Sequence, residues 1–305
     1  MEPAWLVAPL ALGGALLPLL DRGGPRARNV LPGAALLLLA PCLLPAEPRW
    51  LRFAVTVATL TCAAKLLDAL LDGRPWPPLR SWLGWLAMPF GMVRARIGDE
   101  PLLAPRAALA RVGLGLGQAA LGAGLSLLAW RAPPLPFLAE HALRVLSFYV
   151  LLEGTAIALV AAARGLGLHA REVLDRPWLA CTPADFWRRY NRVVGQLLRS
   201  CWRAWGGRRA PLRATLLVFL FSGLFHEYLF WVVLGRAQGV QTAFFLLQGL
   251  SVALTAHRDP RGAARGLGIA LTLTWNLASG VLFFASMEQT FPGIWSSWPL
   301  PFARV

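Results

Sequence analysis

About eight apolar stretches of membrane-spanning length follow one another along the 305-residue chain, and they constrain its fold more than any other feature. A bilayer core requires ~20 apolar residues in each crossing helix. The stretches cover residues 4–20, 30–46, 50–71, 107–129, 137–163, 211–235, 240–256 and 266–286. The sequence therefore predicts an all-α, polytopic integral membrane protein in which residues 1–305 form a single membrane-embedded domain.

Two further segments are predicted to lie along the membrane surface rather than across it. The aromatic-rich stretch 81–93 is too short to span, which indicates an interfacial or re-entrant helix. Residues 184–205 place apolar side chains at spacings of three and four, a pattern typical of an amphipathic helix. The longest predicted connection, Arg164 to Arg213, contains this second segment.

The net charge of +15 comes almost entirely from arginine. Such a charge on a soluble protein would suggest a nucleic-acid partner, but the positions of these arginines along the chain are better explained by membrane topology. The arginines are concentrated in alternate connections between the predicted helices, and by the positive-inside rule those connections are cytoplasmic. This orientation places both termini on the outer side of the membrane. The four cysteines include no CxxC pair, so neither a metal site nor a disulfide framework is predicted.

The amphipathic segment 184–205 carries a basic face that allows two interpretations. Arg188, Arg189 and Arg192 lie on this face, opposite the apolar one. They could contact anionic lipid headgroups at the inner membrane surface. Alternatively, they could hold the phosphates of a nucleotide-bearing co-substrate, because guanidinium groups recognise phosphate in a bidentate manner.

Asn191 is the one polar residue on the apolar face of this predicted helix, roughly level with Trp187. A buried amide without hydrogen-bond partners costs about 1–3 kcal/mol. One interpretation is that a neighbouring backbone group satisfies the Asn191 amide. The other is that the amide faces a cavity and takes part in chemistry.

His226 and Glu227 lie in the middle of the apolar run 211–235, and ionisable residues at membrane depth indicate a functional site. Ser222 and Gly223 share the helical face of His226, whereas Glu227 diverges from it by about 100°. A neutral imidazole, with an ordinary pKa near ~6.5, can accept the proton of an alcohol. The alternative is that His226 only makes packing hydrogen bonds. Neither an HExxH zinc helix nor a GxSxG nucleophile motif occurs, so direct attack on an activated acyl donor fits better than a covalent acyl-enzyme.

Two sequence blocks resemble the membrane-bound O-acyltransferase superfamily, and most closely its wax synthase branch. The run SGLFHEY (222–228) resembles the signature around that family's membrane-embedded histidine. The run RPWLACTPADFWRRYN (176–191) resembles the upstream block that leads to an asparagine. Tyr190 and the Arg188–Arg189 pair differ from related sterol and diacylglycerol enzymes, which favours the wax synthase branch. Gln248 stands where some relatives have a histidine.

The resemblance implies a transferase that esterifies a lipid alcohol with an acyl group from acyl-CoA, its co-substrate, and that uses no other cofactor. On this basis His226 is the expected general base and Asn191 the second polar residue of the site. Glu227, Ser222 and Trp187 are expected to support them, and Arg188, Arg189 and Arg192 to bind the phosphates of acyl-CoA.

The sequence is also compatible with other functions. The same superfamily also acylates sugar, sterol, diacylglycerol and protein acceptors. A different class is a proton-coupled transporter, with His226, Glu227, Lys65, Asp68, Glu140 and Arg144 along its path. Lys65–Asp68 and Glu140–Arg144 are spaced three and four residues apart, so each pair can neutralise itself locally, which weighs against transport.

Overall fold

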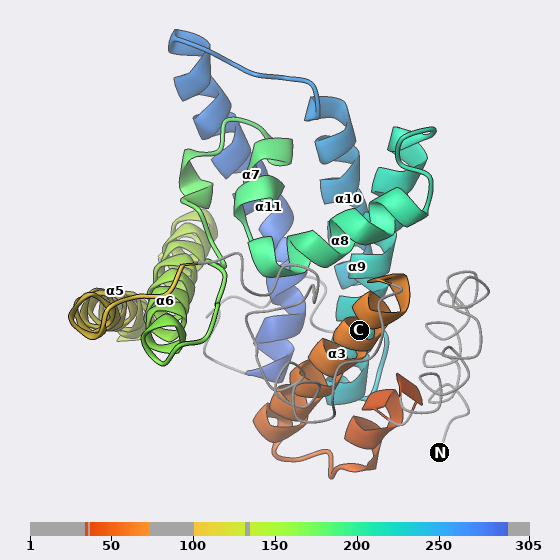
Figure 1. Ribbon diagram of the computed structural model, residues 1–305, viewed down its shortest axis with the longest axis horizontal. Coiled ribbons are helices and arrows are strands. Elements are labelled where there is room, and N and C mark those ends of the chain that lie inside the picture. The colour runs from red at the N-terminus through yellow and green to blue at the C-terminus, as the bar shows by residue number, and fades with distance from the viewer. Residues whose placement is uncertain (1–33, 36, 73–100, 132–134, 292–305) are drawn as a thin grey trace. The chain divides into compact units, whose positions relative to one another are not determined.

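The computed structural model describes residues 34–35, 37–72, 101–131 and 135–291, and every regular element in these ranges is helical (Figure 1). In chain order the elements are η1 (Ala40–Leu43), α3 (Arg49–Asp72), α5 (Pro105–Arg131), α6 (Phe137–Gly165), η3 (Pro177–Leu179), α7 (Pro183–Arg189), α8 (Arg192–Ala204), α9 (Pro211–Leu234), α10 (Val240–Thr255) and α11 (Ala263–Thr290). They divide into two compact units, which are described separately. The first unit combines residues 1–95 and 196–249, and the second combines residues 96–195 and 250–305.

Five of the described helices are long and apolar enough to cross a membrane: Arg49–Asp68, Pro105–Arg131, Phe137–Gly165, Pro211–Leu234 and Ala263–Thr290. They coincide with five of the predicted spans and confirm an all-helical, polytopic membrane protein. The number eight is not confirmed. The sixth apolar helix, α10, has 16 residues, and at 1.5 Å per residue it is shorter than the ~30 Å hydrocarbon core. The stretches 4–20 and 81–93 lie outside the described residues, and 30–46 is described only in part.

In the first unit, α3 packs against α9, and a buried arginine of α3 stabilises the end of α9. Arg52 donates hydrogen bonds to the carbonyl oxygens of Val232, at 3.1 Å, and Leu44, at 2.6 Å. Val232 belongs to the last turn of α9, where carbonyls lack partners within the helix and the helix dipole favours a cation. Gly235 then ends α9 with a left-handed φ of 75°, a conformation that glycine adopts without strain.

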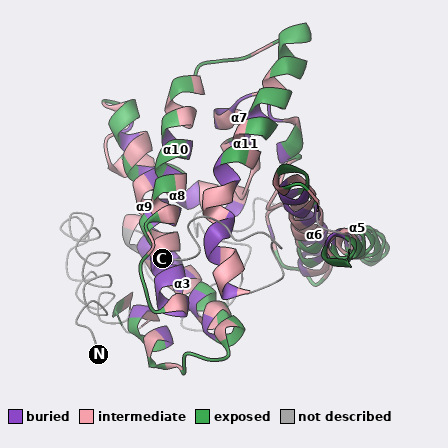
Figure 2. Cartoon of the chain, turned by 180° about the vertical axis from the view of Figure 1, so that it is seen from behind, coloured by how far each residue is buried: buried purple, intermediate pink, exposed green. Residues whose placement is uncertain are grey.

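In the second unit, α5 and α6 run side by side in close contact through glycine (Figure 1). A Cβ atom at Gly122 would lie 2.3 Å from the backbone nitrogen of Leu151, and one at Gly154 would lie 2.3 Å from that of Ala119. Gly115 makes similarly close contacts, whereas Gly113, Gly117 and Gly124 face open space. Much of α5 is exposed (Figure 2), which suits a helix whose solvent is lipid.

Three buried polar side chains of α6, those of Glu140, Arg144 and Ser147, find partners one helical turn away. Glu140 and Arg144 form the predicted ion pair, with 2.6 Å between a carboxylate oxygen and a guanidinium nitrogen, and both side chains are about 5% exposed or less. The hydroxyl of Ser147 donates to the carbonyl oxygen of Leu143 at 2.7 Å. Such local bonds satisfy polar groups where water is excluded.

The prediction of one continuous amphipathic helix over residues 184–205 is wrong. The chain forms α7 and α8 instead, with a break at Tyr190 and Asn191. Tyr190 is extended, with φ −86° and ψ 135°, and Asn191 adopts a left-handed φ of 44°. A left-handed residue cannot continue a right-handed helix. The position of Asn191 on a single helical wheel therefore does not describe its surroundings.

Candidate functional site

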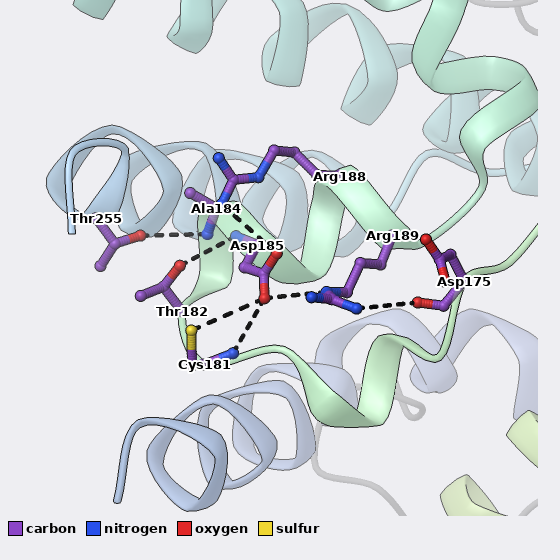
Figure 3. Close-up of polar contacts among 8 residues, drawn as sticks. All are labelled: Asp175, Cys181, Thr182, Ala184, Asp185, Arg188, Arg189 and Thr255. Atoms are coloured by element: carbon purple, nitrogen blue, oxygen red, sulfur yellow. Dashed lines mark hydrogen bonds and ion pairs between the residues drawn. The ribbon is translucent and has the colours of Figure 1, made fainter. Parts of the chain in front are cut away.

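Helix α7 begins at Pro183, one residue before the predicted start at residue 184, and Thr182 caps it. The hydroxyl oxygen of Thr182 accepts a hydrogen bond from the backbone nitrogen of Asp185 at 3.0 Å, and Pro183 occupies the first turn. The backbone nitrogen of Ala184 donates to the hydroxyl of Thr255 at 3.2 Å (Figure 3). These bonds hold the start of α7 within the second unit.

Asp185 pairs with two of the arginines that were expected to bind phosphate (Figure 3). The Oδ2 atom of Asp185 lies 3.0 Å from Nε of Arg189, and its Oδ1 atom lies 3.5 Å from Nη2 of Arg188. Arg189 also donates to the carbonyl oxygen of Asp175 at 3.5 Å, and its side chain is only 26% exposed. Arg188 is 63% exposed. Arg189 is therefore held inside the unit by its contacts, whereas Arg188 presents most of its side chain outward.

Arg192 starts α8 and is tied to the preceding connection by its backbone. Its backbone nitrogen donates to the carbonyl oxygen of Val173 at 2.8 Å, and the residue is half-buried. The backbone nitrogen of Asp175 in turn donates to the carbonyl oxygen of Arg189 at 3.0 Å. These two bonds brace the α7–α8 break from both sides against residues 173–175.

Aromatic rings surround the end of α7. Tyr190 stacks on Phe186 with 5.3 Å between ring centroids, and the ring of Trp187 meets Tyr190 edge-on at 5.7 Å. The ring of Tyr149, from α6, approaches Tyr190 at 5.9 Å. Burial raises the pKa of the Tyr190 hydroxyl to about 12, so this group remains neutral at physiological pH. Trp187 therefore lies in a packed aromatic cluster of the second unit.

Asn191 has a structural role at the break between the two helices. Its Oδ1 atom accepts a hydrogen bond from the backbone nitrogen of Val194 at 3.3 Å, which caps the first turn of α8. Its backbone carbonyl accepts from the nitrogen of Gly195 at 2.8 Å. Asparagine suits this position because it tolerates a left-handed φ and has a side-chain oxygen for the cap. The interpretation that a neighbouring backbone group satisfies Asn191 is confirmed for Oδ1.

His226 is oriented by the carbonyl oxygen of Ser222, one turn earlier in α9. The Nδ1 atom lies 2.8 Å from that oxygen, and a carbonyl can only accept a hydrogen bond, so Nδ1 carries the hydrogen. In the neutral ring Nε2 is then the basic nitrogen. The backbone carbonyl of Ser222 therefore fixes the orientation of the His226 ring.

Helix α10 covers the face of α9 that carries His226. Gly223 permits this approach, because a Cβ atom there would lie 2.9 Å from Cα of Thr242 and 3.2 Å from Cβ of Phe245. The ring of Phe245 lies 4.4 Å from the imidazole of His226, centroid to centroid, with a tilt of 34°. The absence of a side chain at Gly223 therefore admits another helix against the face that carries His226.

Glu227 points to the N-terminus of α10. One carboxylate oxygen accepts hydrogen bonds from the backbone nitrogens of Gln238, at 2.6 Å, and Gly239, at 2.5 Å. The other accepts from those of Gln241, at 3.1 Å, and Thr242, at 3.3 Å. The carboxylate therefore caps a helix.

The residues expected to form the site fall into two groups. His226, Ser222 and Glu227 lie together on α9 in the first unit, while Asn191, Trp187, Arg188, Arg189 and Arg192 surround the α7–α8 break in the second unit. Sequence reasoning missed Phe245 and the role of Gly223 in its approach. The short connection from α9 to α10, which contains Gly235 and Gly239, is a signal that the two helices pack together. Within the described ranges, no group of three or more His, Cys, Asp and Glu residues could hold a metal ion.

Comparisons with known proteins point to one enzyme family. No family model matches the sequence. The chain is 33% identical over 140 residues to probable long-chain-alcohol O-fatty-acyltransferase 2 of Arabidopsis thaliana. The aligned region covers 40% of each protein. It is 33% identical over 132 residues to the long-chain-alcohol O-fatty-acyltransferase of Simmondsia chinensis, which covers 39% of this chain and 38% of that enzyme.

Another Arabidopsis thaliana relative, probable long-chain-alcohol O-fatty-acyltransferase 9, is 34% identical over 119 residues, 34% of each protein. The matches span about two-fifths or less of the length of these curated relatives. The resemblance to wax synthase-like acyltransferases is thus confirmed at the level of sequence similarity.

Proposed function

We propose that the protein is an O-acyltransferase that esterifies a long-chain alcohol with the acyl group of acyl-CoA. The observation that carries the proposal is the orientation of His226, whose Nδ1 donates to the carbonyl of Ser222 and leaves Nε2 as the basic ring nitrogen. The similarity to long-chain-alcohol O-fatty-acyltransferases supports the choice of reaction and acceptor.

The proposed reaction requires one base and no covalent enzyme intermediate. Nε2 of His226 takes the proton of the alcohol as the alcohol oxygen attacks the thioester carbonyl carbon. The carbon–sulfur bond then breaks, and the departing thiolate of CoA takes the proton back from the imidazolium. The products are an ester and CoA, and His226 returns to its neutral form.

Two further roles rest on the motif and on side-chain chemistry. The amide of Asn191 is proposed to donate a hydrogen bond that polarises the thioester, while its Oδ1 caps α8. The phosphates of acyl-CoA are proposed to contact Arg188 and Arg192, with Arg189 contributing charge from its place beside Asp185. The arginine-rich connections are proposed to face the cytoplasm, where acyl-CoA is available.

Three charged residues that were considered for a transport path, Glu227, Glu140 and Arg144, have hydrogen-bond or ion-pair partners within the protein. Glu227 caps α10, and Glu140 pairs with Arg144 within α6. Each of these charges is therefore compensated without a transported proton or solute. These contacts favour the acyltransferase over the transporter.

The test is to incubate the purified protein with labelled acyl-CoA and a panel of acceptors, comprising a long-chain alcohol, a sterol, a diacylglycerol, a sugar and a peptide. We expect label in the ester of the long-chain alcohol. His226→Ala should lower that rate by ~10²–10⁴-fold, the range for loss of a general base. The matched control is His257→Ala, because His257 is exposed in the described structure and should not affect the rate.

Three outcomes would overturn the proposal. Near-normal ester formation by His226→Ala would remove the histidine from the chemistry. Label in another acceptor alone would reject the long-chain alcohol. Proton-coupled solute uptake by proteoliposomes, without release of CoA, would replace the enzyme with a transporter.

A further inference from the structure

A side chain from α9, that of Glu227, accepts hydrogen bonds at the N-terminus of α10. The first backbone N–H groups of a helix have no partner within it, and a nearby negative charge is favoured there. Gly239, which precedes α10, offers no side-chain cap. Glu227 of α9 accepts from four of the N–H groups around this end, as described above. Hydrogen bonds to an ionised acceptor are about twice as strong as neutral ones.

The same end of α10 determines where Phe245 lies. Thr242, whose nitrogen donates to Glu227, is one turn before Phe245 on the same face of the helix. Gly223 contacts both of these residues, so α10 rests directly on α9 at this level. A displacement of the first turn of α10 would therefore move the Phe245 ring, which is 4% exposed and packs on His226.

We propose that Glu227 is a positioning residue, which anchors the N-terminus of α10 and thereby holds the ring of Phe245 against the imidazole of His226. This inference rests on the proposed role of His226 as the base. The ring restricts the imidazole on one side, while the carbonyl of Ser222 holds Nδ1. Together they leave Nε2 in one orientation. Glu227 itself exchanges no proton with substrate, because both of its oxygens accept backbone N–H groups.

Hydrogen exchange of the purified full-length protein tests the anchor without any assay of activity. Glu227→Gln replaces one of the two carboxylate oxygens by an NH₂ group, which cannot accept from a backbone N–H. We expect faster exchange of the amides of residues 238–242 in this variant. The matched control is Glu47→Gln, which alters an exposed carboxylate of the first unit and should leave these amides unchanged. Unchanged exchange in Glu227→Gln would reject the anchor.

Chemical modification tests the link to His226, again independently of the reaction. Diethyl pyrocarbonate modifies neutral imidazoles, and peptide mapping can report His226 and His257 separately. We expect Glu227→Gln and Phe245→Leu each to raise the modification rate of His226 severalfold and to leave that of His257 unchanged. An unchanged rate at His226 in Glu227→Gln would overturn the positioning role, even if the amides of α10 exchange faster.

A double-mutant cycle on ester formation completes the test. Loss of charge-assisted hydrogen bonds by Glu227→Gln should lower kcat roughly tenfold, with little change in KM for acyl-CoA. If Glu227 acts through Phe245, the double variant Glu227→Gln/Phe245→Leu should be no slower than the slower single variant. A double variant whose loss of kcat equals the product of the two single losses would indicate an independent role for the carboxylate. A pH–rate profile that loses an ionisation in Glu227→Gln would indicate the same. If the wild type forms no ester at all, the proposed function fails, while hydrogen exchange and modification still decide the positioning role.

Discussion

The Oδ1 atom of Asn191 lies 3.3 Å from the backbone nitrogen of Val194, and this contact starts α8 immediately after the break that ends α7. The break has a left-handed residue at its centre, since Asn191 has φ 44°. One residue therefore combines a helix cap, a break between two helices and the proposed hydrogen bond to the thioester. Substitutions can separate these roles.

Asn191→Asp should keep the cap and the left-handed backbone, because aspartate also caps helices and tolerates this conformation. It removes the NH₂ donor. We expect stability within about 0.5 kcal/mol of the wild type and a rate of ester formation lower by ~10²-fold, as for loss of a polarising donor. Thermal unfolding in detergent and initial rates measure the two effects. Normal activity in this variant would leave Asn191 with a structural role only.

Arg188 and Arg189 should differ in what their removal changes. Arg188→Ala removes an exposed side chain whose ion pair contributes ~0–1 kcal/mol, so stability should barely change while KM for acyl-CoA rises. Arg189→Ala removes a half-buried group that bridges Asp185 and Asp175, and should lower stability by about 1 kcal/mol. Unfolding midpoints and substrate titrations at two salt concentrations give the comparison. The assignment of Arg188 to phosphate fails if its KM effect is absent at low salt.

Gly122→Ala and Gly124→Ala form a matched pair on α5. A Cβ at Gly122 would lie 2.3 Å from the backbone of Leu151, so α5 and α6 would have to separate, at a cost of about 1–3 kcal/mol. A Cβ at Gly124 meets nothing within 4 Å, and alanine there should be neutral or stabilising by up to ~1 kcal/mol. The thermal unfolding midpoint should fall in Gly122→Ala and should be unchanged or higher in Gly124→Ala. Equal losses would argue against close packing at Gly122.

Cys201 should make the fold sensitive to alkaline pH. Burial, with a further contribution from Asp68, raises the pKa of its thiol from 9.0 to about 12. Because the folded state holds this proton more tightly than the unfolded state, the contribution to stability is fully present below pH ~9 and is lost as pH rises towards 12. The unfolding temperature should therefore fall between pH 9 and 11, and Cys201→Ala should reduce that slope. Rapid alkylation of Cys201 in the folded protein at pH 8 would contradict its burial.

In both the fold and the candidate site, contacts within about one helical turn could be predicted from the sequence, whereas contacts between distant segments could not. The start of α7 at Thr182 and the pairing of Glu140 with Arg144 were predictable, because the partners lie within about one helical turn. The turn at Asn191 was not, since hydrophobic periodicity continues through it and carries no signal for a left-handed φ. The sequence of α5 likewise shows where its glycines lie but not which of them contact α6.

The sequence by itself determined that the chain is helical and membrane-embedded, and it singled out His226, because apolar runs and an ionisable residue within one of them are properties of a continuous segment. Only the tertiary structure decided what surrounds that residue. The bonds of Glu227 reach 11 to 15 positions along the chain to the start of α10, and the ring beside His226 belongs to Phe245. Such contacts follow from how α10 packs on α9 at Gly223, and helical periodicity within either segment does not encode that packing.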